Sequence, residues 1–339
     1  EWSHLEWLSL ADNTVTNLQW EAVPVGLLNL DLRRNRLGAF DLPDGLTNLT
    51  YLVLASNRLD RVTLPPDLVS LEVLALPDNR LTTYAVPTNL PALLALYLDG
   101  NPLSNLVVGP TGAQLLELYL GRTALHDLAL LQETPNLVTL SLAGPPGMDL
   151  TAAGGLGVLG SLTNLHRLDL SRNGLTNVSF GSLPSTLEYL ELNGNELSSL
   201  SLPSGLDGLR HLQLSRNRMR DLSFLSRISG PGTEVSLDLN EMESAELPAG
   251  AGSVGMLHLD SNRLRSLVVP AGYHQLTLLS VSENQLTNLT LAADLQSLRT
   301  LFCENNQLRR VDVPGTLGQL TELGLRQNAL VELRLGEGL

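Results

Sequence analysis

The sequence predicts a solenoid built from short repeats. We expect about fifteen coils, with a curved parallel β-sheet on one face, short strands or 3₁₀ turns on the other, and little α-helix. Three observations support this fold class. An asparagine recurs at a nearly constant interval, and leucines alternate with other residues before it. Leucine is also the dominant apolar residue, while aromatic residues make up only 4% of the chain.

The recurring asparagine sets the length of the repeat. Of the 14 intervals between repeat markers, all but two are 22 residues; the exceptions are 28 residues, from Pro145 to Asn173, and 23 residues, from Asn217 to Asn240. The markers are Asn13, Asn35, Asn57, Asn79, Asn101, Thr123, Pro145, Asn173, Asn195, Asn217, Asn240, Asn262, Asn284, Asn306 and Asn328. A period of this length is typical of a stack of similar coils.

Within each unit, the leucines before the asparagine predict a short strand. In the fourth unit, Leu74 and Leu76 alternate with other residues and therefore point to one side, towards the interior. A fully buried leucine contributes roughly 1.5–3 kcal/mol, but one 22-residue coil cannot bury its own leucines. Stacking against a neighbour on either side buries them. After the asparagine, segments such as "VTLP" at 62–65 predict a short strand or a 3₁₀ turn.

The repeated asparagines are expected to form a ladder. We expect each side chain to hydrogen-bond the turning backbone of its own coil and of the next, because an unpaired buried polar group costs about 1–3 kcal/mol. Thr123 can supply only part of this bonding and Pro145 none. The predicted ladder residues are Asn35, Asn57, Asn79, Asn101, Asn173, Asn195, Asn217, Asn240, Asn262, Asn284, Asn306 and Asn328.

The unit L-x-x-L-x-L-x-x-N-x-L resembles the leucine-rich repeat family, in its bacterial-type form of 22 residues, over essentially the whole chain. The resemblance implies a β-rich member of the α/β-horseshoe superfamily, a fold that hosts many functions. We expect one solenoid over residues 1–339, with an irregular 28-residue repeat at about 137–164 and a loop insertion at about 226–235. Neither end shows the polar cap that such arrays need, so the chain is expected to be a fragment of a longer protein.

Charge and composition exclude several classes of partner. All 21 basic residues are arginines, and 35 acidic residues leave a net charge of −14, which disfavours nucleic acid and anionic membrane surfaces. No apolar run is long enough for a spanning helix, so we expect no direct membrane insertion. The first residues do not resemble a signal peptide, so a targeting segment is expected to be absent from this chain. Cys303 is the only cysteine.

One short motif suggests a nucleotide site that its context does not support. Gly155, Gly157 and Gly160 have the spacing G-x-G-x-x-G. In a dinucleotide site these glycines directly follow a strand, and an acidic residue lies about 20 residues further on. Here the preceding strand ends more than ten residues before Gly155, and residues 178–180 contain no acidic residue. We interpret the segment as an excursion on the back of the seventh repeat.

The outward positions of the strands predict two binding patches. The first, here called the tyrosine patch, consists of Tyr51, Val53, Val73, Tyr97, Asp99 and Tyr119. Tyr97 and Tyr119 occupy the same column of adjacent strands, about 4.8 Å apart. Tyrosine is a frequent anchor of interfaces, which favours binding. The alternative is that these tyrosines only stabilise the sheet across strands.

The second patch, here called the polar patch, consists of Tyr189, Glu191, His211, Gln213, His258 and Asp260, with Asp169, Glu234 and Asp238 beside them. It suits a polar or basic ligand, and its histidines would make binding depend on pH. The alternative is that it is only a solvated acidic face. Because His211 and His258 lie two repeats apart, roughly 10 Å along the sheet, we predict no metal site. Neither G-x-S-x-G nor H-E-x-x-H occurs, so we predict no catalytic residues and no cofactor.

These patterns favour a non-enzymatic recognition scaffold. The expected setting is a bacterial secreted or cell-surface protein, so the predicted location is extracellular or at the cell surface. The expected partner is a protein or a glycan, bound on the exposed face of the strand column. The alternative is a structural component of a surface layer or filament, which would self-associate end to end through uncapped coils.

Overall fold

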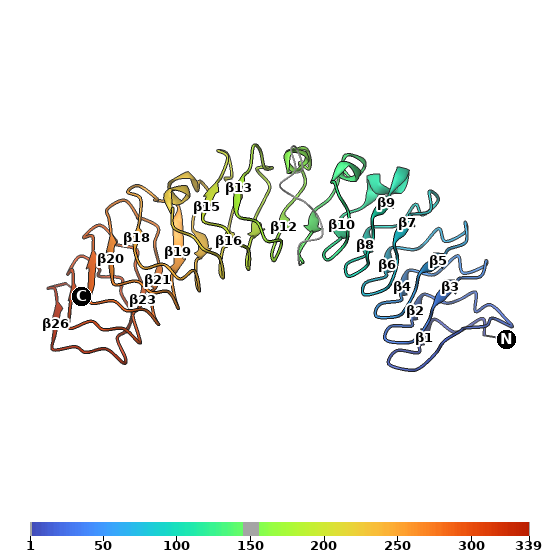
Figure 1. Ribbon diagram of the computed structural model, residues 1–339, viewed down its shortest axis with the longest axis horizontal. Helices are drawn as coiled ribbons and strands as arrows, with labels where there is room; N and C mark the ends of the chain where they lie inside the picture. Colours follow the sequence, from blue (N-terminus) through green and yellow to red (C-terminus); the bar gives the residue numbers. More distant parts are fainter. Residues whose placement is uncertain (1, 145–155, 339) are drawn as a thin grey trace. The chain divides into compact units, whose positions relative to one another are not determined.

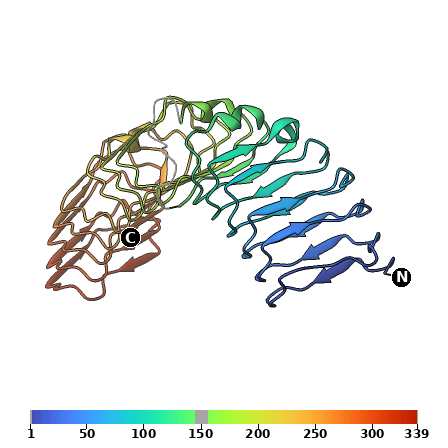
Figure 2. The same cartoon turned by 45° about the vertical axis from the view of Figure 1, so that its right-hand side comes forward.

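The computed structural model describes residues 2–144 and 156–338, in two compact units, Glu1–Leu168 and Asp169–Leu339. Each unit is a stack of coils whose parallel strands follow one another along one face (Figures 1 and 2). Strand β12 (Arg167–Asp169) contains the boundary between the units. The repeat marker Pro145 and the first glycine of the G-x-G-x-x-G motif, Gly155, lie outside the described residues.

In the first unit, seven strands of three residues form the parallel face that holds the tyrosine patch. They are β1 (Trp7–Ser9), β2 (Asn29–Asp31), β4 (Tyr51–Val53), β6 (Val73–Ala75), β8 (Ala95–Tyr97), β10 (Glu117–Tyr119) and β11 (Thr139–Ser141). The back of the coils carries the second short strand that the sequence predicts, in β3 (Ala39–Asp41), β5 (Arg61–Thr63), β7 (Thr83–Ala85) and β9 (Asn105–Val107). The coil of β9 continues into a 3₁₀ helix, η1 (Gly109–Gln114), and later coils carry the 3₁₀ helices η2 (Ala129–Glu133) and η3 (Gly157–Ser161).

In the second unit, seven further parallel strands form the face that holds the polar patch. They are β14 (Tyr189–Glu191), β16 (His211–Gln213), β17 (Thr233–Ser236), β19 (Val254–His258), β21 (Leu278–Ser280), β23 (Thr300–Phe302) and β25 (Glu322–Gly324). The back carries β13 (Asn177–Ser179), β15 (Ser199–Ser201), β18 (Ala245–Glu246), β20 (Ser266–Val269), β22 (Asn288–Leu291), β24 (Arg310–Val313), β26 (Glu332–Leu335) and the 3₁₀ helix η4 (Ser223–Arg227). The predicted fold class, a β-rich solenoid with little helix, is confirmed.

The register between face strands repeats the sequence period. Leu52 pairs with Leu74 and Leu74 with Leu96, each 22 residues on, so equivalent side chains lie in straight columns across the strands. The 23-residue interval changes this register, because Leu212 pairs with Val235. The loop predicted at 226–235 is shorter in the structure and spans 228–232, because η4 ends at Arg227 and β17 begins at the buried Thr233.

The inward columns form the core of each unit. Leu74 and Leu76 are fully buried, as are their equivalents in neighbouring coils, Leu52, Leu54, Leu96 and Leu98. The outward residue between them, Ala75, is partly exposed. Strands of three residues are too short to form a core alone. The leucine columns are buried because each coil stacks against a neighbour on either side.

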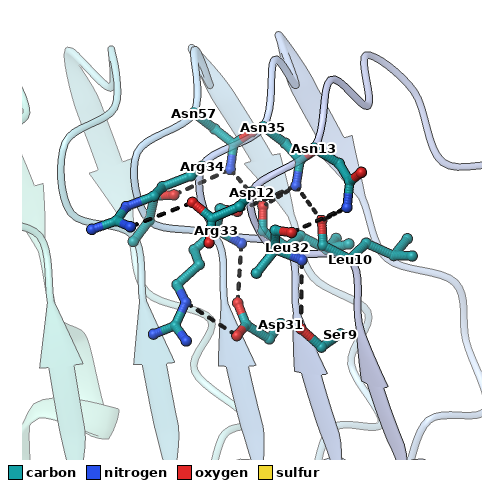
Figure 3. Close-up of polar contacts among 12 residues, drawn as sticks. Ser9, Leu10, Asp12, Asn13, Asp31, Leu32, Arg33, Arg34, Asn35 and Asn57 are labelled. Atoms are coloured by element: carbon teal, nitrogen blue, oxygen red, sulfur yellow. Dashed lines mark hydrogen bonds and ion pairs between the residues drawn. The ribbon is translucent and has the colours of Figure 1, made fainter.

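The asparagine ladder holds each coil to the one before it. The Nδ2 of Asn57 donates to the carbonyl oxygens of Leu54 in its own coil, at 3.1 Å, and of Leu32 in the preceding coil, at 3.0 Å. Its Oδ1 accepts the backbone N–H of Leu37, also in the preceding coil, at 3.1 Å. Figure 3 shows the bonds of Asn35 to Leu10 in the preceding coil and to Leu32 in its own coil, and the bond of Asn57 to Leu32. The expectation of bonds to the next coil was wrong in direction: the partner is the preceding coil.

The ladder also fixes an unusual turn. The residue before each ladder asparagine has a positive φ in every described coil, as in Ser56 (55°), Asp78 (54°) and Leu239 (57°). This left-handed conformation costs a non-glycine residue roughly 1–2 kcal/mol, and the asparagine hydrogen bonds offset that cost. At Thr123 the hydroxyl donates to the carbonyl oxygen of Leu120 at 2.8 Å, a bond within its own coil.

Candidate functional site

The outward columns of each unit form a surface, here called the strand face, that contains every predicted binding residue. In the first unit the register places Tyr97 directly beside Tyr119, and Val53 two strands from Tyr97. In the second unit it places Tyr189 beside His211. Some outward side chains are buried by their neighbours on this face; Asp31 is one and Ser236 is another. The residues of the two predicted patches are partly or fully exposed.

The tyrosine patch is organised around a stacked pair. The rings of Tyr97 and Tyr119 lie with their centroids 4.6 Å apart and their planes at 19°. The hydroxyl of Tyr97 donates to Oε2 of Glu117 at 2.8 Å, which fixes the ring along its length. Glu117 belongs to the neighbouring strand β10 and was not among the predicted residues. The stack and the hydrogen bond together hold a half-buried aromatic pair in one orientation.

Asp99 lies two residues beyond Tyr97 on the same coil. Partial burial raises the pKa of its carboxyl, and the nearby charge of Asp78 adds to this, while the guanidinium of Arg122 opposes it. The Nη2 of Arg122 lies 2.7 Å from Oδ1 of Asp78, so this arginine is already held in an ion pair. At neutral pH the strand face therefore presents a poorly solvated negative charge beside the tyrosine rings.

The polar patch is organised around one carboxylate. The rings of Tyr189 and His211 stack with centroids 4.4 Å apart and planes at 8°. The Nδ1 of His211 lies 3.0 Å from Oε2 of Glu234, and Nε2 of His258 lies 3.7 Å from Oε1 of the same residue. The two histidines, predicted to be separated by two repeats, therefore meet at Glu234. No group of three or more His, Cys, Asp or Glu residues within the described chain has an arrangement that could hold a metal ion.

Asp260 continues the polar patch on the next coils. One oxygen accepts the backbone N–H of Ser282 at 2.6 Å, and both oxygens lie 2.7 Å from the hydroxyl of Ser280. Partial burial nevertheless raises the pKa of this carboxyl; the hydrogen bonds and His258 oppose the rise, and Asp238 adds to it. Asp260 is thus a charge that the fold orients with hydrogen bonds but solvates poorly.

Replacing Asp260 with asparagine is expected to increase the stability of the protein at neutral pH. The folded-state pKa is raised above the unfolded value, so the folded state binds the proton more tightly. The stability from this residue is therefore present at low pH and is lost as pH rises through the folded pKa. Asparagine keeps an acceptor for Ser282 and removes the charge. We expect a gain of less than about 1 kcal/mol, since the site is partly solvated, and none at a pH below about 4.

Chemical denaturation of D260N at several pH values measures this effect. The matched control is Asp221→Asn, because Asp221 is exposed and its side chain likewise accepts a backbone N–H, that of Ser223 at 2.9 Å. A D260N protein that is less stable than the wild type at neutral pH would show that the charge is well accommodated, contrary to this prediction.

Three apolar residues of the strand face were missed by the sequence analysis. Met256 is exposed, and Leu278 and Phe302 are partly exposed, all on β19, β21 and β23 beside the polar patch. The sequence pattern places all three at outward positions of the strands, but no tyrosine lies beside them to mark a patch. The strand face of the second unit thus combines carboxylates with apolar side chains.

The glycines of the nucleotide-like motif do not form a phosphate-binding turn in the described residues. Gly157 and Gly160 lie within η3, a 3₁₀ helix of 5 residues, on the back of the first unit.

No helix among the residues of the described ranges is sufficiently long and apolar to cross a membrane.

Comparison with known proteins agrees with a stack of leucine-rich coils. A family model described as leucine rich repeat matches residues 158–223. The fold is similar to that of a leucine-rich-repeat protein of Leptospira interrogans, with 20% identity, a TM-score of 0.59, and coverage of 97% of this chain and 92% of that chain. A search among curated proteins finds no match.

Two structures from Listeria monocytogenes are also similar. An internalin shares 18% identity at a TM-score of 0.51, over 98% of this chain and 87% of that one. The functional domain of InlJ shares 20% identity at a TM-score of 0.59, over 98% of this chain and 65% of that one. The repeat, the ladder and the parallel strand face define the class, a β-rich repeat solenoid. The chain has the leucine-rich repeat fold, and residues 158–223 match the family model. Proteins of this fold are commonly protein-binding scaffolds and are typically not enzymes.

Proposed function

We propose that this chain is a non-enzymatic recognition scaffold that binds a protein or a glycan through its strand face. The observation that carries the proposal is the fixed orientation of partly exposed aromatic groups in both units. Tyr97 and Tyr119 are stacked in one unit, and Tyr189 and His211 in the other. Side chains that are ordered before binding lose less entropy on binding, which increases affinity.

The charges on the strand face support the same proposal. Asp99 and Asp260 are both retained as carboxyls with raised pKa values, although burial penalises their ionised forms. Carboxylates held at a cost in stability are frequent in functional sites. We further propose a bacterial secreted or cell-surface protein, because the 22-residue repeat is of bacterial type. Its site of action would then be extracellular or at the cell surface.

Binding to glycan and peptide arrays tests the proposal, with three proteins compared. The first is the wild type and the second is the strand-face double variant Tyr97→Ala with Tyr119→Ala. The third is a matched control on the back of the same unit, Thr83→Ala with Val107→Ala, where both residues are exposed. We expect the strand-face variant to lose at least tenfold in affinity for the array ligand, since each aromatic anchor contributes roughly 1–2 kcal/mol or more.

The control variant should bind like the wild type. If the strand-face variant of the first unit keeps full binding, the site must lie on the second unit, and Glu234→Ala there is then expected to abolish binding. If neither variant affects binding, the strand face is not the site.

The alternative is a structural protein that assembles end to end, and light scattering over a concentration series tests it. Polymers that grow with protein concentration, together with no ligand on the arrays, would favour this assembly.

A further inference from the structure

Beside the stacked tyrosines, one outward side chain is much smaller than its neighbours. The column that contains Tyr97 and Tyr119 continues through Ala75 on β6 to Val53 on β4. The face of Tyr97 that does not contact Tyr119 is therefore turned towards the space above Ala75. Two strand spacings separate Val53 from Tyr97, roughly 9.6 Å. This leaves room for a single planar group, which needs about 3.5–4 Å to the atoms on each side.

This space, here called the Ala75 slot, has apolar walls. Tyr97 and Val53 form its two sides and Ala75 its floor. Val73 and Pro77 flank the floor along the same coil and are partly exposed. A planar group entering the slot would therefore stack on an aromatic face without displacing any hydrogen bond of Tyr97, whose hydroxyl remains bonded to Glu117.

The charges around the slot are negative. Glu117 accepts the hydroxyl of Tyr97, and the poorly solvated carboxyl of Asp99 lies two residues beyond Tyr97. Two residues along extended backbone correspond to roughly 6.6 Å, so a group stacked on the ring lies within reach of Asp99. The nearby Arg122 forms its ion pair with Asp78, at 2.7 Å, and its guanidinium offsets only part of the effect of burial on Asp99, whose pKa remains raised. An occupant that is both planar and positively charged complements these features.

We propose that the Ala75 slot receives the guanidinium group of an arginine from a polypeptide partner, stacked on Tyr97 and paired with Asp99. A guanidinium is planar, remains charged, is weakly hydrated and stacks on aromatic faces, whereas an ammonium group is compact and strongly hydrated. The inference rests on the proposed function, since it assigns the partner's chemistry at one point of the strand face.

Nuclear magnetic resonance of the tyrosine rings tests the slot with a small probe, N-acetyl-arginine amide. We expect saturable shifts of the Tyr97 ring signals, with a Kd on the order of millimolar for so small a ligand. N-acetyl-lysine amide, which has the same charge, is expected to bind at least about threefold more weakly, because it cannot stack as a plane. Equal binding of the two probes would mean general charge attraction and would overturn the proposal.

Two matched variants locate the binding. Ala75→Leu fills the slot and is expected to weaken the arginine probe at least about tenfold, because the side chain occupies the stacking position. Ser141→Leu places the same side chain on the other side of the tyrosine pair, beside Tyr119, and should leave binding unchanged. Asp99→Asn is expected to weaken binding about threefold or more by removing the paired charge. All three substituted positions are outward and partly exposed, and unchanged backbone amide spectra confirm the fold.

Wild-type affinity of A75L for the arginine probe would overturn the slot. The slot would also be overturned if an uncharged ring compound, phenol or methyl glucoside, bound the protein more tightly than the arginine probe does. The outcome is separable from that of the proposed function. If an array ligand depends on Tyr97 and Tyr119 while the arginine probe does not bind, the strand face is functional and the slot is wrong. If the arginine probe binds as expected and no macromolecule depends on the strand face, the slot exists but the proposed function is wrong.

Discussion

Replacing Asn57 with alanine is expected to lower the free energy of unfolding by at least about 3 kcal/mol, because several buried groups lose their partners together. Asn57 is 9% exposed, and its side chain bonds the carbonyl oxygens of Leu54 and Leu32 and the N–H of Leu37. All three hydrogen bonds are buried, so the variant leaves these backbone groups without their partner. The left-handed turn at Ser56 also loses the bonds that hold it.

Urea denaturation of N57A, followed by circular dichroism, measures this loss. The control is Asn13→Ala, because Asn13 is exposed and its Nδ2 donates only within its own coil, to Leu10 and Ala11 at 3.1 Å. We expect a loss below about 1 kcal/mol for N13A, as for an exposed hydrogen bond. Equal losses for the two variants would contradict a ladder that stabilises through the preceding coil.

The second large effect on stability is expected in the core, where a small side chain in one coil lies next to a large one in the following coil. At the turn after the back strand, several coils place a buried leucine, as at Leu68 and Leu295, whereas two successive coils have Ala251 and Tyr273. The position is equivalent because the N–H three residues later bonds back to it in both coils, Val254 to Ala251 and Leu276 to Tyr273. Tyr273 is 0% exposed and Ala251 1%, and because interiors are closely packed we expect the larger ring to fill the space that the alanine leaves.

Ala251→Leu is therefore expected to destabilise the protein by about 1–3 kcal/mol, because its side chain has no room beside the ring. Adding Tyr273→Leu should recover most of that loss, since two leucines reproduce the arrangement of coils such as those of Leu68 and Leu295. It also removes a buried hydroxyl that has no hydrogen-bond partner. Thermal denaturation of the two single variants and the double variant forms a double-mutant cycle. Additive effects would show that the two residues do not share one space.

Much of the fold could be predicted from the sequence because the period is nearly constant. A 22-residue interval between Asn35, Asn57 and Asn79 places equivalent residues side by side whatever the details of the coil. The direction of the ladder could not be predicted in this way. Whether an asparagine side chain turns towards the preceding or the following coil depends on backbone and side-chain torsion angles at the turn, and spacing alone does not reveal those angles.

The candidate site was predictable as columns but not as contacts. The spacing places Tyr97 beside Tyr119, and the structure stacks their rings. The spacing also keeps His211 and His258 two strands apart, and it gave no indication that Glu234 reaches both. A glutamate side chain has several rotatable bonds, so its reach across columns depends on rotamers that a repeat pattern does not specify.

The direction of the ladder has a consequence for the order in which the protein acquires its structure during synthesis. Asn57 supplies the missing partners of Leu32 and Leu37, which lie 25 and 20 residues earlier in the chain. Because a protein emerges from the ribosome with its N-terminus first, a newly made coil is left with unpaired polar backbone until the next repeat has emerged. Each turn of the nascent chain thus matures one repeat behind the point of synthesis, and the coil most recently released is always the least protected.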